Sequence, residues 1–111
     1  MGTDLGKTST GLEPNVAGLL CYLAGFVSGI IFLLIEKDNK FVRFHAMQSI
    51  ITFGAIFVLE AIANFMPFLG GLLTTLLGAA CVVAWILCMI KAYQGEKFKL
   101  PVIGDIAEQK M

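Results

Sequence analysis

Charge is scarce in this chain. Lys, Arg, Asp and Glu account for 14% of its 111 residues, whereas soluble domains carry about 25%. The two signs cancel to a formal net charge of zero. No basic patch interleaved with aromatic residues is present, so we expect no nucleic-acid partner. At this length the chain forms a single domain, and its low charge indicates a surface that mostly does not face water.

Residues that commonly carry chemistry are also few. The chain has three cysteines and one histidine. Cys21, Cys81 and Cys88 fall in apolar runs, where a cysteine is usually a small buried side chain, and Cys81 and Cys88 are too far apart along one helix to form a disulfide. The sequence lacks a nucleophile elbow, a phosphate-binding glycine loop and paired carboxylates on one helix face. We therefore expect no enzyme activity, no cofactor and no metal site.

Long apolar runs are abundant instead, and hydrophobic residues make up 58% of the chain. Residues 16–35 carry no charge, and residues 44–90 are almost unbroken apolar sequence in which Pro67 and the pair Gly70-Gly71 indicate a turn. A helix needs about 20 apolar residues to cross the hydrocarbon core of a bilayer. An open β structure would leave its backbone groups unpaired in lipid.

These runs predict an all-α integral membrane protein, built as a three-transmembrane-helix bundle with a short cytoplasmic loop and a surface-lying C-terminal tail. The predicted segments are a polar N-terminal tail (1–15), a first span (16–35), a charged loop (36–43), a second span (44–65), a short outer turn (66–68), a third span (69–90) and a C-terminal tail (91–111).

The basic residues near the span ends predict the orientation. The charged loop carries Lys37, Lys40 and Arg43, and the C-terminal tail carries four lysines. The N-terminal tail has only Lys7, and the outer turn has no charge. Because cytoplasmic loops are enriched in Lys and Arg, we expect a cell-membrane protein whose charged loop and C-terminus are cytoplasmic and whose N-terminus is outside.

Small residues indicate how the spans could pack together. Gly25 and Gly29 form a GxxxG pattern in the first span, and the third span has small residues at spacings of three and four, including Gly71 and Gly78. Such positions let helix backbones approach closely in lipid. Two interpretations stay open. The small residues either pack the three helices of one bundle together, or they form a contact with a second copy or with a larger membrane complex.

The second span carries a polar stripe. At 100° per residue one arc of this helix contains His45, Gln48, Ser49, Thr52, Glu60 and Ala63. We expect the stripe to face the bundle interior, which leaves Phe53, Phe57 and Val58 available to lipid or to neighbouring helices. His45 and Gln48, where this span meets the cytoplasm, are expected to hydrogen-bond to the backbone of the loop or tail.

Glu60 is the one acidic residue within a predicted span. An ionisable group near the middle of a membrane costs about 2.5–3.5 kcal/mol on insertion scales. Two interpretations are open, which are a protonated or interface-reaching glutamate that helps the helices dock, and a site that handles protons or cations.

Two blocks of sequence carry a family resemblance. The first is the motif Phe41-x-Arg43-Phe44-His45-Ala46-x-Gln48, preceded by Asn15-Val16-Ala17, and the second is Ala92-Tyr93-Gln94-Gly95 followed by Leu100-Pro101. This arrangement resembles a Tic-twenty-like family of small uncharacterised membrane proteins from bacteria and archaea. The family is named for distant similarity to a membrane subunit of the chloroplast inner-envelope import machinery. The resemblance implies a helical membrane fold and no assigned activity, and it makes Arg43, His45 and Gln48 the first residues to test.

The expected function is accordingly non-enzymatic. We expect a scaffold or an accessory subunit of a membrane assembly, with the lipid bilayer and other membrane proteins as partners. The alternative is an oligomeric small channel, or a subunit of a proton- or ion-coupled transporter, whose path the stripe from Thr52 to Glu60 would line.

Overall fold

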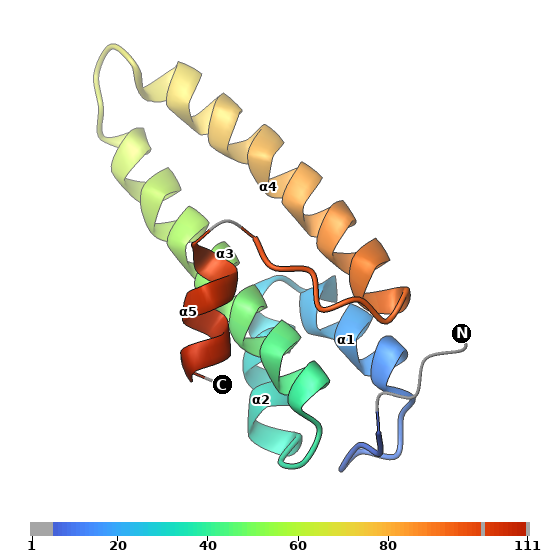
Figure 1. Ribbon diagram of the computed structural model, residues 1–111. Helices are drawn as coiled ribbons and strands as arrows, with labels where there is room; N and C mark the ends of the chain where they lie inside the picture. The colour runs from blue at the N-terminus through green and yellow to red at the C-terminus, as the bar shows by residue number, and fades with distance from the viewer. Residues whose placement is uncertain (1–5, 101, 111) are drawn as a thin grey trace.

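The structure of this protein is a computed structural model that describes residues 6–100 and 102–110. Within these residues the regular elements are all helices, joined by turns and loops, and there is no strand. Figure 1 shows its elongated shape, with principal extents of 50 × 24 × 22 Å. The helices in chain order are α1 (Pro14–Leu23), α2 (Phe26–Ile35), α3 (Lys40–Asn64), α4 (Gly70–Tyr93) and α5 (Ile103–Lys110).

The two long helices, α3 and α4, form the frame of the molecule. The side chain of Asn39 caps α3 by accepting a hydrogen bond from the Val42 N–H, and residues 65–69 turn the chain back into α4. Each helix is about 36–38 Å long, which exceeds the roughly 30 Å thickness of a bilayer core. They are the two candidate membrane spans. Both exceed the ranges predicted from sequence, by four residues at the start of α3 and by three at the end of α4.

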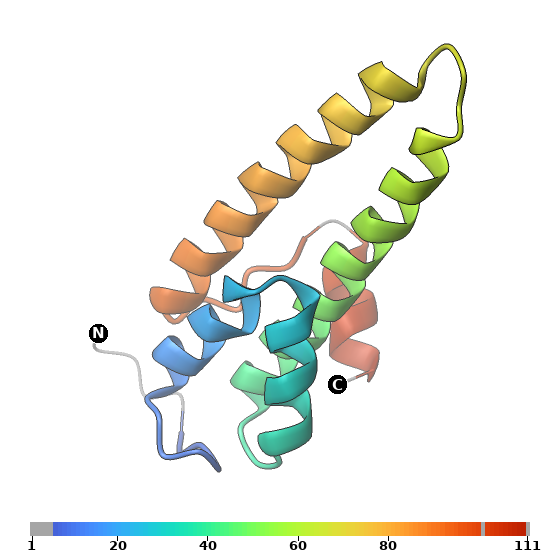
Figure 2. The same ribbon diagram turned by 180° about the vertical axis from the view of Figure 1, so that it is seen from behind.

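A single helix over residues 16–35 is a wrong prediction. The chain forms two ten-residue helices there, α1 and α2, with a break at Ala24 and Gly25. Gly25 has φ +62°, a conformation that favours glycine. The Ser28 hydroxyl accepts a hydrogen bond from the Ala24 N–H and lies within hydrogen-bond distance of the carbonyl oxygens of Cys21 and Gly25. The chain reverses direction at this point, so α1 and α2 form a hairpin (Figures 1 and 2).

The α1–α2 hairpin packs against the first part of α3 and the last part of α4. Its tip, at Gly25, lies against Phe53 near the middle of α3. The Trp85 indole N–H donates to the Tyr22 carbonyl at 2.6 Å, which ties α4 to the end of α1. Each hairpin helix is only about 15 Å long, so the hairpin reaches roughly half the length of the frame.

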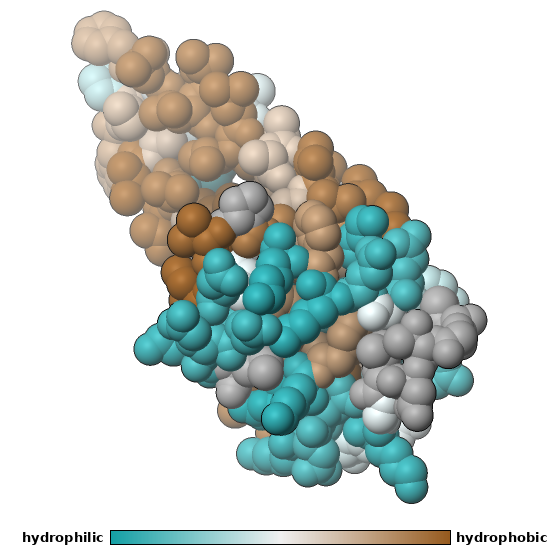
Figure 3. All heavy atoms as spheres, in the orientation of Figure 1, coloured by the Kyte–Doolittle hydropathy of each residue, from teal (hydrophilic) through white to brown (hydrophobic). Residues whose placement is uncertain are grey.

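Buried side chains concentrate where the hairpin packs. We call the part that contains α1, α2, residues 40–53 and residues 81–93 the wide half, and we call residues 54–80 the narrow half. Nine of the ten buried residues of α3 lie in the wide half, and the tenth is Ala63. Large apolar side chains cover the narrow half, and Figure 3 shows them as a brown surface beyond the hydrophilic end of the molecule. The most exposed of them include Phe57, Val58, Ile62, Phe65, Phe68 and Leu72.

The polar stripe is largely interior, as its periodicity indicated. His45, Gln48 and Ser49 are fully buried, and Thr52 is buried as well. Of the residues expected to face lipid or neighbouring helices, Phe53 contacts a neighbour, because its ring packs edge-on against Tyr22 from the hairpin, at 6.3 Å between centroids. Phe57 and Val58 are exposed. The three cysteines are free, with Cys21 and Cys88 buried and Cys81 half-buried.

The N-terminal segment lies at the same end of the molecule as the charged loop. The Ser9 N–H donates to the Glu36 carboxylate at 2.8 Å, and the Asn39 side chain donates to the Lys7 carbonyl at 3.2 Å. The prediction that residues 1–15 and the charged loop lie on opposite sides of a membrane is therefore wrong for residues 6–15. The reversal at Gly25 is the cause, because it returns the chain to the end from which it started. Residues 1–5, Pro101 and Met111, which belong to the predicted tails, lie outside the described residues.

Candidate functional site

The centre of the sequence motif is a group of three fully buried polar side chains from two helices. Tyr22 from α1 lies between His45 and Gln48, which are three residues apart on one face of α3. The Tyr22 hydroxyl is 2.7 Å from His45 Nδ1 and accepts a hydrogen bond from Gln48 Nε2 at 2.9 Å. Rings of Phe41 and Phe44 pack edge-on against the imidazole, with centroids 4.6 and 5.2 Å away.

The partners of His45 determine where its proton lies. Its Nε2 is 2.9 Å from the Glu96 carbonyl oxygen, which can only accept, so Nε2 must carry a hydrogen. A neutral imidazole with its hydrogen on Nε2 has an acceptor at Nδ1, which takes the hydrogen of the Tyr22 hydroxyl while the Tyr22 oxygen accepts from Gln48. The imidazole is neutral in this arrangement, and both of its nitrogens are engaged within the chain.

The C-terminal tail docks on this group through its backbone. Residues 96–100 are non-helical, and the groups that face α3 are the carbonyls of Glu96 and Phe98 and the N–H of Leu100. Gln48 donates to the Phe98 carbonyl at 2.8 Å and accepts from the Leu100 N–H at 3.0 Å. In an extended chain these alternate residues point to one edge, so His45 and Gln48 pair with the tail as a neighbouring strand would. The prediction that both side chains bind loop or tail backbone is confirmed.

Charged side chains fix the tail from its outer side. The Lys97 ammonium lies 5.1 Å from the centre of the Phe44 ring, and Lys97 and Lys99 both pair with Glu108 of α5. The hydrogen bond to Glu108 raises the pKa of Lys99, and the bonds from Lys97 and Lys99 lower the pKa of Glu108. These pairs are exposed to solvent, so each contributes little stability, but together they direct α5 back along α3.

Arg43, another motif residue, holds the end of α2. One of its guanidinium nitrogens donates to the carbonyls of Leu33 and Glu36, at 3.1 and 2.7 Å. The last carbonyls of a helix have no partner within the helix, and Arg43 supplies one from the adjacent α3. The motif therefore joins α2, α1 and the tail to a single stretch of α3.

The Glu36 carboxylate organises the charged loop. Its Oε2 accepts hydrogen bonds from the N–H groups of Ser9, Asn39 and Asp38, at 2.8, 3.1 and 3.2 Å. Burial raises the pKa of Glu36, but the hydrogen bonds from Ser9, Asn39 and Asp38 lower it by more, so the pKa lies below its usual value. Glu36 acts as an anchor for the N-terminal segment.

The glycines of α2 and of α4 differ in how closely other helices approach them. A Cβ on Gly29 would lie 2.8 Å from the Ala46 carbonyl oxygen and 3.0 Å from the Ser49 Cβ, so α2 meets α3 through that glycine. The Ser49 hydroxyl donates to the Gly25 carbonyl at 2.8 Å. Around Gly71 and Gly78 of α4, nothing lies within 4 Å of an added Cβ. The glycines predicted as a packing seam in the third span therefore have no partner helix among the described residues.

Glu60 and Thr52 stand apart from the motif group. Glu60 is half-buried in the narrow half. Glu60 Oε1 and Thr52 Oγ1 are buried atoms without a hydrogen-bond partner among the described residues.

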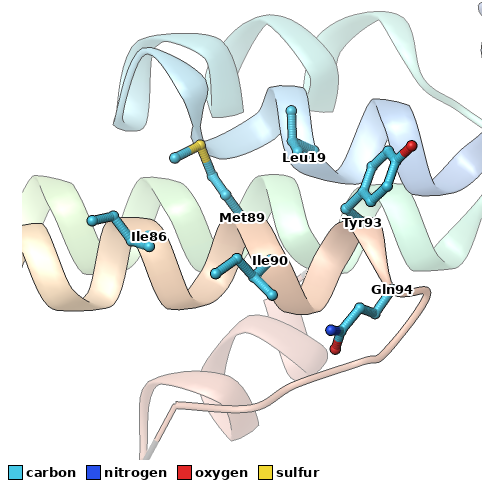
Figure 4. Close-up of a pocket in the computed structure, with 6 residues that line it drawn as sticks. All are labelled: Leu19, Ile86, Met89, Ile90, Tyr93 and Gln94. Atoms are coloured by element: carbon cyan, nitrogen blue, oxygen red, sulfur yellow. The ribbon is translucent and has the colours of Figure 1, made fainter.

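Other concave surfaces of the described residues offer little chemistry. The described part contains no group of three metal-binding side chains. An apolar pocket of about 330 Å³ lies between α1 and α4, and its lining is Leu19, Ile86, Met89, Ile90, Tyr93 and Gln94 (Figure 4). This lining has no acid and no base.

One member of the buried polar group, Tyr22, was not predicted from the sequence. It is the only phenol in residues 16–35, and that hydroxyl within an apolar run was the available signal. The tail residues Glu96 and Phe98 bind His45 and Gln48 through backbone carbonyls, which leave no mark on the amino-acid sequence.

Proteins similar to this chain are archaeal membrane proteins. A UPF0132 membrane protein of Methanocaldococcus jannaschii is 58% identical over 105 residues, which cover 95% of this chain and 94% of that protein. A UPF0132 membrane protein of Archaeoglobus fulgidus is 51% identical over 100 residues, covering 90% and 97%. No solved structure matches the chain.

The predicted class, a family of small prokaryotic membrane proteins, is confirmed by these relatives, whereas none of the matches shows the Tic-twenty-like relationship. A family model matches residues 10–107, almost the whole chain and all of the motif residues. The chain therefore belongs to the magnetosome magnetite crystal formation protein family, MamF/MmsF.

Proposed function

We propose that this protein is a non-enzymatic membrane protein that acts by associating with other membrane components, as a scaffold or an accessory subunit. The observation that carries this proposal is that the side chain best suited to catalysis, His45, already has its hydrogen-bond partners within the chain. Both nitrogens of His45, and both polar atoms of the adjacent Gln48, bind partners within the chain. A catalytic acid or base must reach the substrate, and these groups hold the fold together instead.

The topology we propose has two spans and one hairpin that enters and leaves on the same face. The helices α3 and α4 cross the bilayer, and the α1–α2 hairpin reaches its middle. All eight Lys and Arg residues belong to the N-terminal segment, the charged loop with the start of α3, or the end of α4 with the tail. By the excess of basic residues in cytoplasmic segments, we assign this end to the cytoplasm.

Accessibility of single cysteines tests this topology. We expect the variants Lys7→Cys and Lys40→Cys to react with an impermeant maleimide only after cells are permeabilised. Phe68→Cys, in the outer turn and 94% exposed, should react in intact cells. The unmodified chain is the blank for the native cysteines, of which Cys21 and Cys88 are buried and Cys81 is half-buried. Labelling of Lys7→Cys in intact cells, with Lys40→Cys still protected, would restore three spans and contradict this topology.

The second candidate is an oligomeric proton or cation path, and the observation that favours it is Glu60. This carboxyl lies in the narrow half with one oxygen unpartnered among the described residues, where an acid costs about 2.5–3.5 kcal/mol to insert. Several copies that meet along the narrow half could surround these groups with water.

Flux through proteoliposomes separates the two candidates. If the protein is a scaffold, a pH-sensitive dye inside the vesicles should report no more proton entry than in protein-free vesicles. Flux that Glu60→Gln abolishes and that the matched change Glu96→Gln, at the polar end, leaves intact would establish the path and refute the scaffold-only role.

A further inference from the structure

The cross-sectional area of the protein differs between its two ends. Four helices lie side by side in the wide half, and only α3 and α4 continue into the narrow half (Figures 1 and 2). The hairpin tip stops near Phe53, where a Cβ added to Gly25 would lie 3.9 Å from the Phe53 Cβ. In the proposed topology, this stopping point is close to the boundary between the two leaflets.

The size of this difference follows from helix dimensions. A helix with its side chains is about 10–12 Å across, so its cross-section is about 80–110 Å². The two hairpin helices together add about 160–220 Å² to one leaflet and nothing to the other. The tail and α5, which pack on α3 at the same end, add to the difference.

A wedge acts on a membrane only if the hairpin cannot fold away, and this hairpin is held at several points. Gly29 packs directly on the α3 backbone at Ala46. The Ser49 hydroxyl binds the Gly25 carbonyl, and the Trp85 indole binds the Tyr22 carbonyl from the opposite side. The tip is thus bonded to both long helices.

We propose that this protein is a one-leaflet wedge whose partner is a strongly curved lipid surface, convex on the face that carries the charged loop, residues 6–13 and the tail segment 96–100. The outer leaflet of a curved membrane has the larger area and accommodates the extra helices of the wide half. The inner leaflet has the smaller area, and only the two helices of the narrow half cross it. Membrane insertion that depends on curvature is a general property of elements that enter one leaflet. The inference rests on the topology proposed above.

Orientation in vesicles of different size tests the wedge. The full chain with Lys40→Cys, labelled with a fluorophore, is reconstituted from detergent into small sonicated and large extruded phosphatidylcholine vesicles. An impermeant quencher then reports the fraction of chains whose wide half faces outward. We expect the outward-to-inward ratio to be about twofold or more higher in small vesicles, a preference of about 0.4 kcal/mol. Chains in the two orientations are matched controls, because they have the same sequence and the same fold.

A label at the other end makes the result unambiguous. Phe68→Cys should report the mirror-image fractions, and Lys7→Cys should agree with Lys40→Cys. A ratio that does not change with vesicle size, or that falls in small vesicles, would overturn the wedge and leave the topology intact. Opposite sides for Lys7→Cys and Lys40→Cys would overturn the topology and the wedge together.

Discussion

Replacing Gln48 by leucine is expected to release the C-terminal tail from the helices. The amide of Gln48 makes hydrogen bonds to Phe98, Leu100 and Tyr22, at 2.8, 3.0 and 2.9 Å. A hydrogen bond of this kind contributes about 1 kcal/mol net. Two of the three bonds reach the tail, so the change should weaken tail docking by about 2 kcal/mol. That free energy corresponds to roughly a thirtyfold larger population of the undocked tail.

Limited trypsin digestion in mild detergent measures this effect, since Lys97 and Lys99 lie in the docked segment. We expect cleavage there to accelerate by up to about thirtyfold, because proteolysis follows the population of the open form when opening is fast. The matched control is Gln94→Leu, a glutamine in an exposed position just after α4. Equal cleavage rates in the two variants would show that Gln48 does not hold the tail.

Replacing Gly29 by alanine is expected to destabilise the protein, and replacing Gly78 by alanine is expected to do the reverse. An added Cβ at Gly29 would lie 2.8 Å from the backbone oxygen of Ala46, so α2 must move away from α3. Overpacking of this kind costs about 1–3 kcal/mol. At Gly78 the space is open, and alanine in a helix interior gains up to about 1 kcal/mol over glycine.

Thermal unfolding of the detergent-solubilised variants, followed by circular dichroism, gives the comparison. Gly29→Ala should lower the midpoint by several degrees and Gly78→Ala should leave it unchanged or raise it. This experiment also resolves the two interpretations of the GxxxG pattern. If Gly29 instead mediated contact between copies, its replacement would change the oligomeric state and leave the unfolding midpoint of the monomer unaffected.

The long helices and the buried stripe could be predicted because their signals are local. Apolar length defines α3 and α4, and a 100° period places His45, Gln48 and Ser49 on one interior face. The polar atoms of His45 and Gln48 needed acceptors and donors near the membrane surface, and backbone of the tail was the nearest source. The exact partners, Glu96, Phe98 and Leu100, could not be predicted, since a backbone carbonyl is the same in every residue.

The hairpin could not be predicted because its cause is a backbone angle. Gly25 and Ser28 are compatible with a continuous helix in lipid, where small residues are common, and mean hydropathy is the same whether the chain continues or reverses. One missed reversal has a large consequence for topology. In the proposed topology it lowers the number of crossings from three to two, and the side assigned to the N-terminal segment changes with it.

The uncharged turn at residues 65–69 has a consequence for how the protein enters a membrane. In the proposed topology, the narrow half, which includes this turn, is all that must pass into the far leaflet and to the far side of the bilayer. Apart from Glu60 it carries no ionisable group, whereas each charged residue at mid-membrane would cost about 2.5–3.5 kcal/mol. Biosynthesis therefore requires no translocation of a charged segment, and α3 and α4 can insert together as one helical pair after both have left the ribosome.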